Sequence, residues 1–98
     1  MLIQYKNRQI QRVCTVASVA EKKHGKMMAE RIQQRVDQIE AAETVEWMIQ
    51  FRIGRCHPLK GDREGQYAVD LIHPYRLIFK IKGKTDQIAV ILSIEDYH

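Results

Sequence analysis

The sequence predicts an α+β fold in which an N-terminal helical hairpin packs on a mostly antiparallel sheet of four or five strands. Three observations support this prediction. Apolar residues recur at helical spacing in the first half of the chain, the period changes after Arg52, and the second half consists of short β-type runs separated by turn residues. A chain of 98 residues is long enough for one compact core, so we expect a single domain over residues 1–98.

The first half begins with the segment LIQY, which is typical of a short edge strand. Asn7 then caps a helix that ends at Gly25, and one side of this helix is apolar: Ile10, Val13, Cys14, Ala17 and Ala20. A second helix is expected from about Lys26 to Ala42, with an apolar stripe of Met28, Ile32, Val36 and Ile39. The two helices form the predicted hairpin.

A further short helical turn is expected after Thr44, whose side chain can cap it. This turn would bring Val45, Trp47 and Met48 to the core. Beyond Arg52 the runs CHPL, QYAVDLI, YRLIFKIK and IAVILSI predict a meander of strands. In YRLIFKIK, alternation places apolar residues on one face and Arg76, Ile78, Lys80 and Lys82 on the other, so the helices should cover one face of the sheet and basic residues should line the other.

Charge and composition narrow the class of protein. The net charge is +4 and the isoelectric point is about 9.2, which favours an anionic partner. Residues 52–84 hold eight cations and three anions, a local charge of +5, and a basic region of this kind suits a phosphate backbone. No run approaches the roughly 18 apolar residues of a membrane span, and the first residues do not resemble a signal peptide. We therefore expect a cytoplasmic protein with no membrane partner.

Three motifs in the second half carry a more specific signal. The segment from His57 to Tyr67, HPLKGDREGQY, is followed by YRLIF at residues 75–79 and by the terminal DYH at residues 96–98. In order and spacing, these motifs closely resemble the RelE/HigB toxin superfamily, also described as RelE/ParE, and the HigB-like branch is the nearest. The resemblance covers roughly residues 50–98, while the first half matches only in its helical pattern and length.

The resemblance implies a RelE-like α+β domain that cleaves messenger RNA, usually at the ribosome, until a cognate antitoxin blocks it. It implies a functional set of five residues: His57, Lys60, Arg76, Tyr97 and His98. Asp96 would orient His98, and the neighbouring cations would contact RNA: Arg55, Arg63, Lys80 and Lys82. The implied antitoxin is a small helix-turn-helix protein of the HigA type, through which the complex would bind operator DNA.

The chemistry of these side chains agrees with that activity. Metal-independent cleavage of RNA needs a base for the 2′-hydroxyl proton, an acid for the leaving oxygen and cations for the charge on phosphorus. His57 and His98 suit the proton transfers, with either one as the base, and Lys60 and Arg76 suit the phosphate. No cofactor and no metal is expected, because Cys14 and Cys56 lack a paired metal-ligand spacing. Tyr97 alternates away from His98 along an extended chain, so its role rests on the resemblance alone.

Two other functions fit the same pattern. One is a noncatalytic toxin of the ParE type, which shares the architecture and acts on DNA gyrase. The other is a module whose basic face only binds nucleic acid. Taken singly, each histidine and each cation is also consistent with an ordinary surface residue, and it is their combination in one motif that favours a ribonuclease.

Overall fold

The computed structural model describes residues 1–96. Its strands form one five-stranded sheet in the order β1-β5-β4-β3-β2. The strands are β1 Leu2–Tyr5, β2 His57–Pro58, β3 Gln66–Asp70, β4 Tyr75–Lys82 and β5 Ile88–Asp96. All neighbours are antiparallel except β1 and β5, which run parallel. The predicted α+β class, the edge strand at the start and the meander that follows are confirmed.

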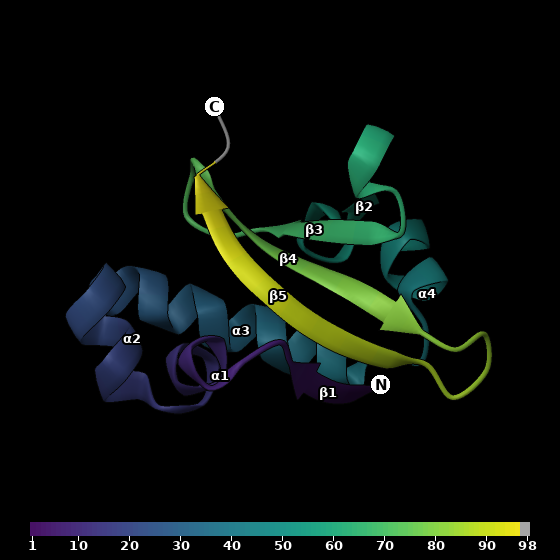
Figure 1. Cartoon of the computed structure of the whole chain (residues 1–98). Helices are drawn as coiled ribbons and strands as arrows, with labels where there is room; N and C mark the ends of the chain where they lie inside the picture. Colours follow the sequence, from purple (N-terminus) through teal and green to yellow (C-terminus); the bar gives the residue numbers. More distant parts are fainter. Residues whose placement is uncertain (97–98) are drawn as a thin grey trace.

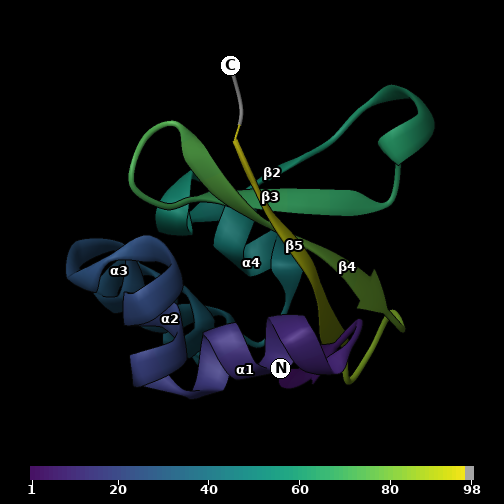
Figure 2. The same cartoon turned by 60° about the vertical axis from the view of Figure 1, so that its left-hand side comes forward.

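The helices gather mainly on one side of this sheet. They are α1 Arg8–Thr15, α2 Ala17–His24, α3 Lys26–Ala41 and α4 Val45–Gln50, and two short 3₁₀ turns follow, η1 Ile53–Arg55 and η2 Gly61–Arg63. Figure 1 shows α1, α2 and α3 below the sheet, and the view in Figure 2 shows the turn between β2 and β3 projecting on the opposite side. Within residues 1–96, no helix combines the length and the hydropathy that a membrane crossing requires.

The first predicted helix is interrupted, so the helical region is not a simple hairpin. Asn7 accepts a hydrogen bond from the Ile10 N–H as expected, but Val16 adopts an extended conformation with φ −118° and ψ 104° and separates α1 from α2. Val16 is β-branched and 40% exposed, so no core contact holds it in helical geometry. The break allows α2 to turn and pack against α3.

Helix α4 forms where Thr44 predicts it. The Thr44 hydroxyl accepts a hydrogen bond from the Trp47 N–H at 3.1 Å, and Val45 and Met48 are buried. The expectation that Trp47 would also reach the core is wrong, because its side chain is 43% exposed and lies against the exposed ring of Phe51. In a helix of six residues only one stripe can face the core, and Val45 and Met48 occupy it.

The core lies between the helices and one face of the sheet. Leu77 and Phe79 of β4 are fully buried there, as the alternation of that strand predicts. The opposite face is less uniformly basic than predicted. Ile78 is also fully buried, in a second small cluster with Leu59 and Ala68, because the segment that follows β2 folds back over the sheet. This segment positions the candidate site.

Candidate active site

His57 lies in β2, next to a tight turn that fixes its ring. Its Nδ1 is 2.9 Å from the carbonyl oxygen of Arg55. A carbonyl oxygen only accepts hydrogen bonds, so Nδ1 carries the proton and, in the neutral ring, Nε2 is left as an acceptor. Arg55 itself adopts the left-handed conformation with φ 54°, which costs a non-glycine residue about 1 kcal/mol. This turn therefore needs stabilising contacts from elsewhere in the site.

Arg76 lies at the centre of a row of charges that crosses three strands. In the register of the sheet, Arg76 of β4 is opposite Asp70 of β3 on one side and Glu95 of β5 on the other. Residues opposite one another on neighbouring strands share a face, so all three side chains lie on the face away from α1–α3. The Arg76 Nε is 3.3 Å from Oδ1 of Asp70. The sheet thus places two carboxylates beside the arginine that sequence analysis assigned to phosphate binding.

Two further arginines extend this row at its ends. The Arg55 Nε lies 3.3 Å from Oδ2 of Asp70. At the other end, Nη1 and Nη2 of Arg63 each donate to one carboxylate oxygen of Glu95 at 2.7 Å, a bidentate pair. We call the resulting sequence of alternating signs, Arg55–Asp70–Arg76–Glu95–Arg63, the charge row. It runs from the turn before His57 across β3, β4 and β5 to Arg63 of η2.

The carboxylate of Glu95 is fixed from two sides. The hydrogen bonds from Arg63 hold its pKa below the usual value of 4.5, and the Ser93 hydroxyl, which donates to Oε2 at 2.6 Å, acts in the same direction, while burial opposes both. The Arg63 Nε also donates to the Gln66 side chain at 3.2 Å. Arg63, expected to bind RNA, is therefore also a clamp that holds turn η2 onto the sheet.

Lys60 lies in the same segment but projects outward. It is exposed and precedes η2, between the buried Leu59 and the clamped Arg63. Lys80 and Lys82 are exposed farther along β4, on the same face as Arg76, and the Lys82 ammonium is 3.3 Å from the Gln4 side-chain oxygen. The structure therefore brings His57, Arg55, Arg63 and Arg76 into one connected region and keeps the three lysines at its surface.

Three predicted residues follow one another at the end of the sequence. Asp96 is exposed and pairs with Tyr75 in the register of β4 and β5, one position beyond the Arg76–Glu95 pair. Tyr97 and His98 lie outside the described residues. Their roles stay predictions.

The two carboxylates of the charge row were not among the residues predicted from the sequence. Asp70 was counted only as an anion that offsets local charge, and Glu95 was given no role. Alternation along β3 and β5 could have placed both on the basic face, but their pairing with particular arginines depends on strand register. A second omission is visible in the sequence itself: residues 6–26 hold six cations and one anion, the same net charge of +5 as residues 52–84 in a shorter segment. The six cations of residues 6–26 are all exposed: Lys6, Arg8, Arg12, Lys22, Lys23 and Lys26.

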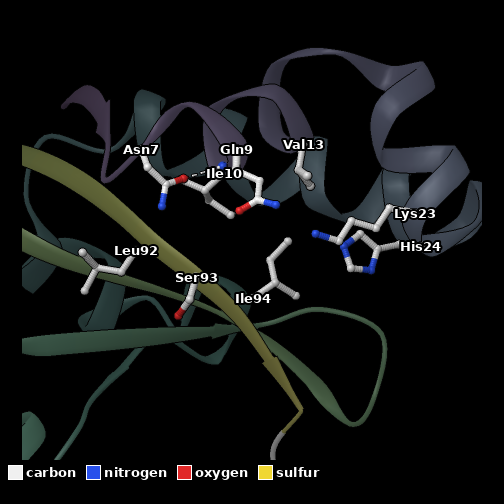
Figure 3. Close-up of a pocket in the computed structure, with 9 residues that line it drawn as sticks. All are labelled: Asn7, Gln9, Ile10, Val13, Lys23, His24, Leu92, Ser93 and Ile94. Carbon is white, nitrogen blue, oxygen red and sulfur yellow. Dashed lines mark hydrogen bonds between the residues drawn. The ribbon is translucent and has the colours of Figure 1, made fainter.

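Other reactive groups do not join this region. Cys56 precedes His57, but burial raises the pKa of its thiol to about 12, so the thiolate is scarce at neutral pH. Among residues 1–96, no three His, Cys, Asp or Glu side chains gather closely enough to hold a metal ion. A hollow of about 230 Å³ lies between α1, the end of α2 and β5, and Lys23, His24, Gln9 and Ile94 are among the residues that line it (Figure 3). It shares no residue with the predicted site.

Comparison with known proteins identifies the family of the chain. Endoribonuclease HigB of Proteus vulgaris is 37% identical to this chain over 70 residues, which are 70% of this chain and 71% of that protein. The chain belongs to the RelE/ParE toxin superfamily. Within it, the chain is a relative of the HigB endoribonucleases, and the resemblance seen in its sequence motifs is confirmed. No family model matches the chain.

Solved structures of the superfamily have the same fold. A YoeB/ParE toxin from Agrobacterium tumefaciens superposes with a TM-score of 0.68 at 14% identity over the whole of both chains. A YoeB from Staphylococcus aureus, solved as a dimer, superposes with a TM-score of 0.66 at 20% identity, covering 100% of this chain and 97% of the other. At these identities the likeness is evidence for the RelE-like fold alone.

Proposed function

We propose that this chain is the toxin of a type II toxin–antitoxin pair, a cytoplasmic endoribonuclease that cleaves ribosome-bound mRNA without a metal and so inhibits translation. The observation that carries the proposal is the position of His57: its Nδ1 is held by the backbone carbonyl of Arg55, a member of the charge row, which leaves Nε2 as an acceptor. A base next to clustered guanidinium groups suits attack on an RNA phosphate. Relationship to the HigB endoribonucleases supports the same activity.

The reaction can be written with each proton accounted for. The His57 Nε2 takes the proton of a ribose 2′-hydroxyl, and the 2′-oxygen then forms a bond to the adjacent phosphorus. The bond from phosphorus to the 5′-oxygen breaks, which leaves a 2′,3′-cyclic phosphate on one product. An acid returns a proton to the leaving 5′-oxygen, and we assign that role to His98. Arg76 and Lys60 stabilise the charge that develops on the phosphate oxygens.

The substrate side of the proposal rests on electrostatics. RNA would approach the open face of the sheet, where Lys80 and Lys82 are exposed and Arg55 has 75% of its side chain exposed. The exposed cations of residues 6–26 add long-range attraction for a polyanion. A cognate HigA-like helix-turn-helix antitoxin would neutralise the toxin and tether it to operator DNA.

The test compares cleavage by the parent chain and two variants in a translation extract, with cut sites mapped by primer extension. His57→Ala should lower the cleavage rate by about 10²-fold or more, since a positioned base contributes about 10²–10⁴-fold. Arg76→Ala should lower it by about 10²–10³-fold, since it removes one group that stabilises the charge of the transition state. Where the parent chain also cleaves ribosome-free RNA, the rate of that cleavage should not change when divalent metals are chelated. The matched control is His73→Ala, because His73 is exposed in the turn between β3 and β4.

Undiminished cleavage by both site variants would contradict the mechanism. Growth arrest that survives both substitutions, together with inhibited DNA supercoiling, would instead identify a gyrase-directed toxin of the ParE type. Binding to RNA with neither cleavage nor growth arrest would leave only a nucleic-acid-binding module.

A further inference from the structure

Asp70 contacts arginines from three separate elements of the fold. Its carboxylate lies 3.3 Å from the Nε of Arg55, which belongs to η1, and 3.3 Å from the Nε of Arg76 in β4. Its backbone carbonyl accepts a hydrogen bond from the Nε of Arg35 in α3 at 2.6 Å. The end of β3 is thus the point at which a helix, the turn before His57 and the neighbouring strand are joined.

The fold makes room for this arrangement. A Cβ added to Gly54 would lie 2.8 Å from the Arg35 Nε, so the glycine lets the Arg35 side chain pass beneath the turn on its way to Asp70. The turn itself is held open in an unfavourable conformation, with positive φ at Arg52, Gly54 and Arg55. Contacts at Asp70 offset the cost of this conformation in Arg55, whose carbonyl fixes His57.

The carboxylate of Asp70 is partly withdrawn from water. Its side chain is 26% exposed, and Oδ1 is buried with no hydrogen-bond partner, since the nearby Arg76 Nε lies within ion-pair distance but outside hydrogen-bond geometry. Both arginines are engaged at Nε, the nitrogen closest to their own backbone. A charge held there fixes the last torsions of each side chain and thereby the plane of each guanidinium.

We propose that Asp70 is a positioning residue that orients Arg76 and Arg55 for the scissile phosphate and, with its negative charge, reduces the attraction of these arginines for RNA. The proposal rests on the ribonuclease function above. It assigns two opposite effects to one carboxylate: Asp70 raises the rate of the bound complex and lowers the affinity for the substrate. A residue that only stabilises the fold would not change these two quantities in opposite directions.

The experiment measures affinity and rate separately in the full chain. Binding is measured with a 2′-O-methyl RNA oligonucleotide, which lacks the nucleophile, over a range of salt concentrations. Asp70→Asn should bind more tightly at low salt, and the plot of log affinity against log salt should be steeper by about 0.7, the contribution of one additional phosphate contact on a single strand. Cleavage of the matching RNA should show a kcat lower by about 10- to 100-fold, with KM equal or reduced.

A second variant separates charge from position. Asp70→Glu keeps the charge but moves the carboxylate by one methylene group, so the salt slope should stay that of the parent while kcat falls. The control is Asp37→Asn, the same change at an exposed carboxylate on α3, on the other side of the sheet. It should alter neither quantity. Melting curves establish whether each variant is folded. If Asp70→Asn does not fold, the effect of Asp70→Glu on kcat tests the proposal instead.

The outcomes distinguish the two proposals. If the parent chain cleaves RNA and both Asp70 variants keep its kcat, the positioning role is wrong. If kcat falls but the salt slope of Asp70→Asn does not steepen, the electrostatic part is wrong and Asp70 acts on geometry alone. If the parent chain cleaves RNA neither free nor on ribosomes, the ribonuclease function fails first.

Discussion

The bidentate pair between Arg63 and Glu95 allows a quantitative test of how the loop over the sheet is held. Glu95→Gln keeps the size and shape of the side chain but removes its charge and replaces one acceptor with a donor. Arg63 then loses one of its two 2.7 Å hydrogen bonds, and the remaining one no longer joins opposite charges. Turn η2, which contains Arg63, should be held less firmly against β5.

The expected loss of stability follows from the exposure of the pair. Hydrogen bonds to charged groups contribute about 1.5–3 kcal/mol where they are shielded from water. The two side chains are 34% and 31% exposed, so solvent screening reduces the contribution of this pair toward about 1 kcal/mol. For a domain of this size, about 1 kcal/mol corresponds to a fall of about 4–8 °C in the melting temperature. Glu64→Gln, an exposed neighbour in the same loop, should change it by little.

The effect should depend on pH in a definite direction. The pKa of Glu95 in the folded chain lies below its usual value of 4.5, chiefly because of Arg63. The pair therefore contributes its full stability above about pH 4.5 and loses it as the pH falls through the lowered pKa. Thermal unfolding of parent and variant across this range should show a difference at pH 7 that disappears in acid. Equal melting temperatures at pH 7, or a difference that persists in strong acid, would refute the reasoning.

Three further predictions concern the framework around the site. Gln87 is 5% exposed and accepts a hydrogen bond from the buried Val45 N–H at 2.8 Å. Gln87→Ala should therefore lower the free energy of unfolding, measured by chemical denaturation, by about 1–3 kcal/mol. Gln87→Asn should not restore this stability, because its shorter side chain cannot reach the Val45 N–H. Burial raises the pKa of both Cys14 and Cys56 to about 12, so alkylation of the two thiols at pH 8 should be slow until the protein unfolds. Rapid labelling of the native chain would contradict their burial. Ile78→Ala should lower the free energy of unfolding by about 2–5 kcal/mol, because Ile78 is fully buried on the face away from the helices, against Leu59 and Ala68. A decrease below about 0.5 kcal/mol in urea unfolding would show that this cluster packs loosely.

The sequence predicted the elements of this fold better than their junctions. Asn7 and Thr44 are strong cap signals, and both caps form as expected. The break at Val16 carries no glycine or proline, and the apolar positions on its two sides continue the same helical phase. Packing therefore determines the position of the break: contacts between α2 and α3 stabilise the fold more than a continuation of α1 would. Spacing along one segment cannot report contacts with another segment.

The candidate site shows a similar division. His57 and Arg76 could be selected from the sequence, because the motif around them is specific in order and spacing. The role of Asp70 could not, since the residues that meet it come from α3, η1 and β4, and their approach depends on strand register and on the turn at Gly54. Counting charges along the chain treated Asp70 as a general offset and gave Glu95 no role. In the folded chain each neutralises particular arginines.

The position of β5 in the sheet has a consequence for the order in which the chain can fold as it is synthesised. This strand pairs with β4 on one side and with β1, the first strand of the chain, on the other. Until residues 88–96 have emerged, β1 and β4 have no common neighbour and each exposes an unpaired edge, a condition that favours association with other chains. Glu95 belongs to the same strand, so Arg63 cannot form its ion pair with Glu95 before β5 has been synthesised. Nascent chains should therefore stay without nuclease activity, and vulnerable to proteases, until this strand inserts.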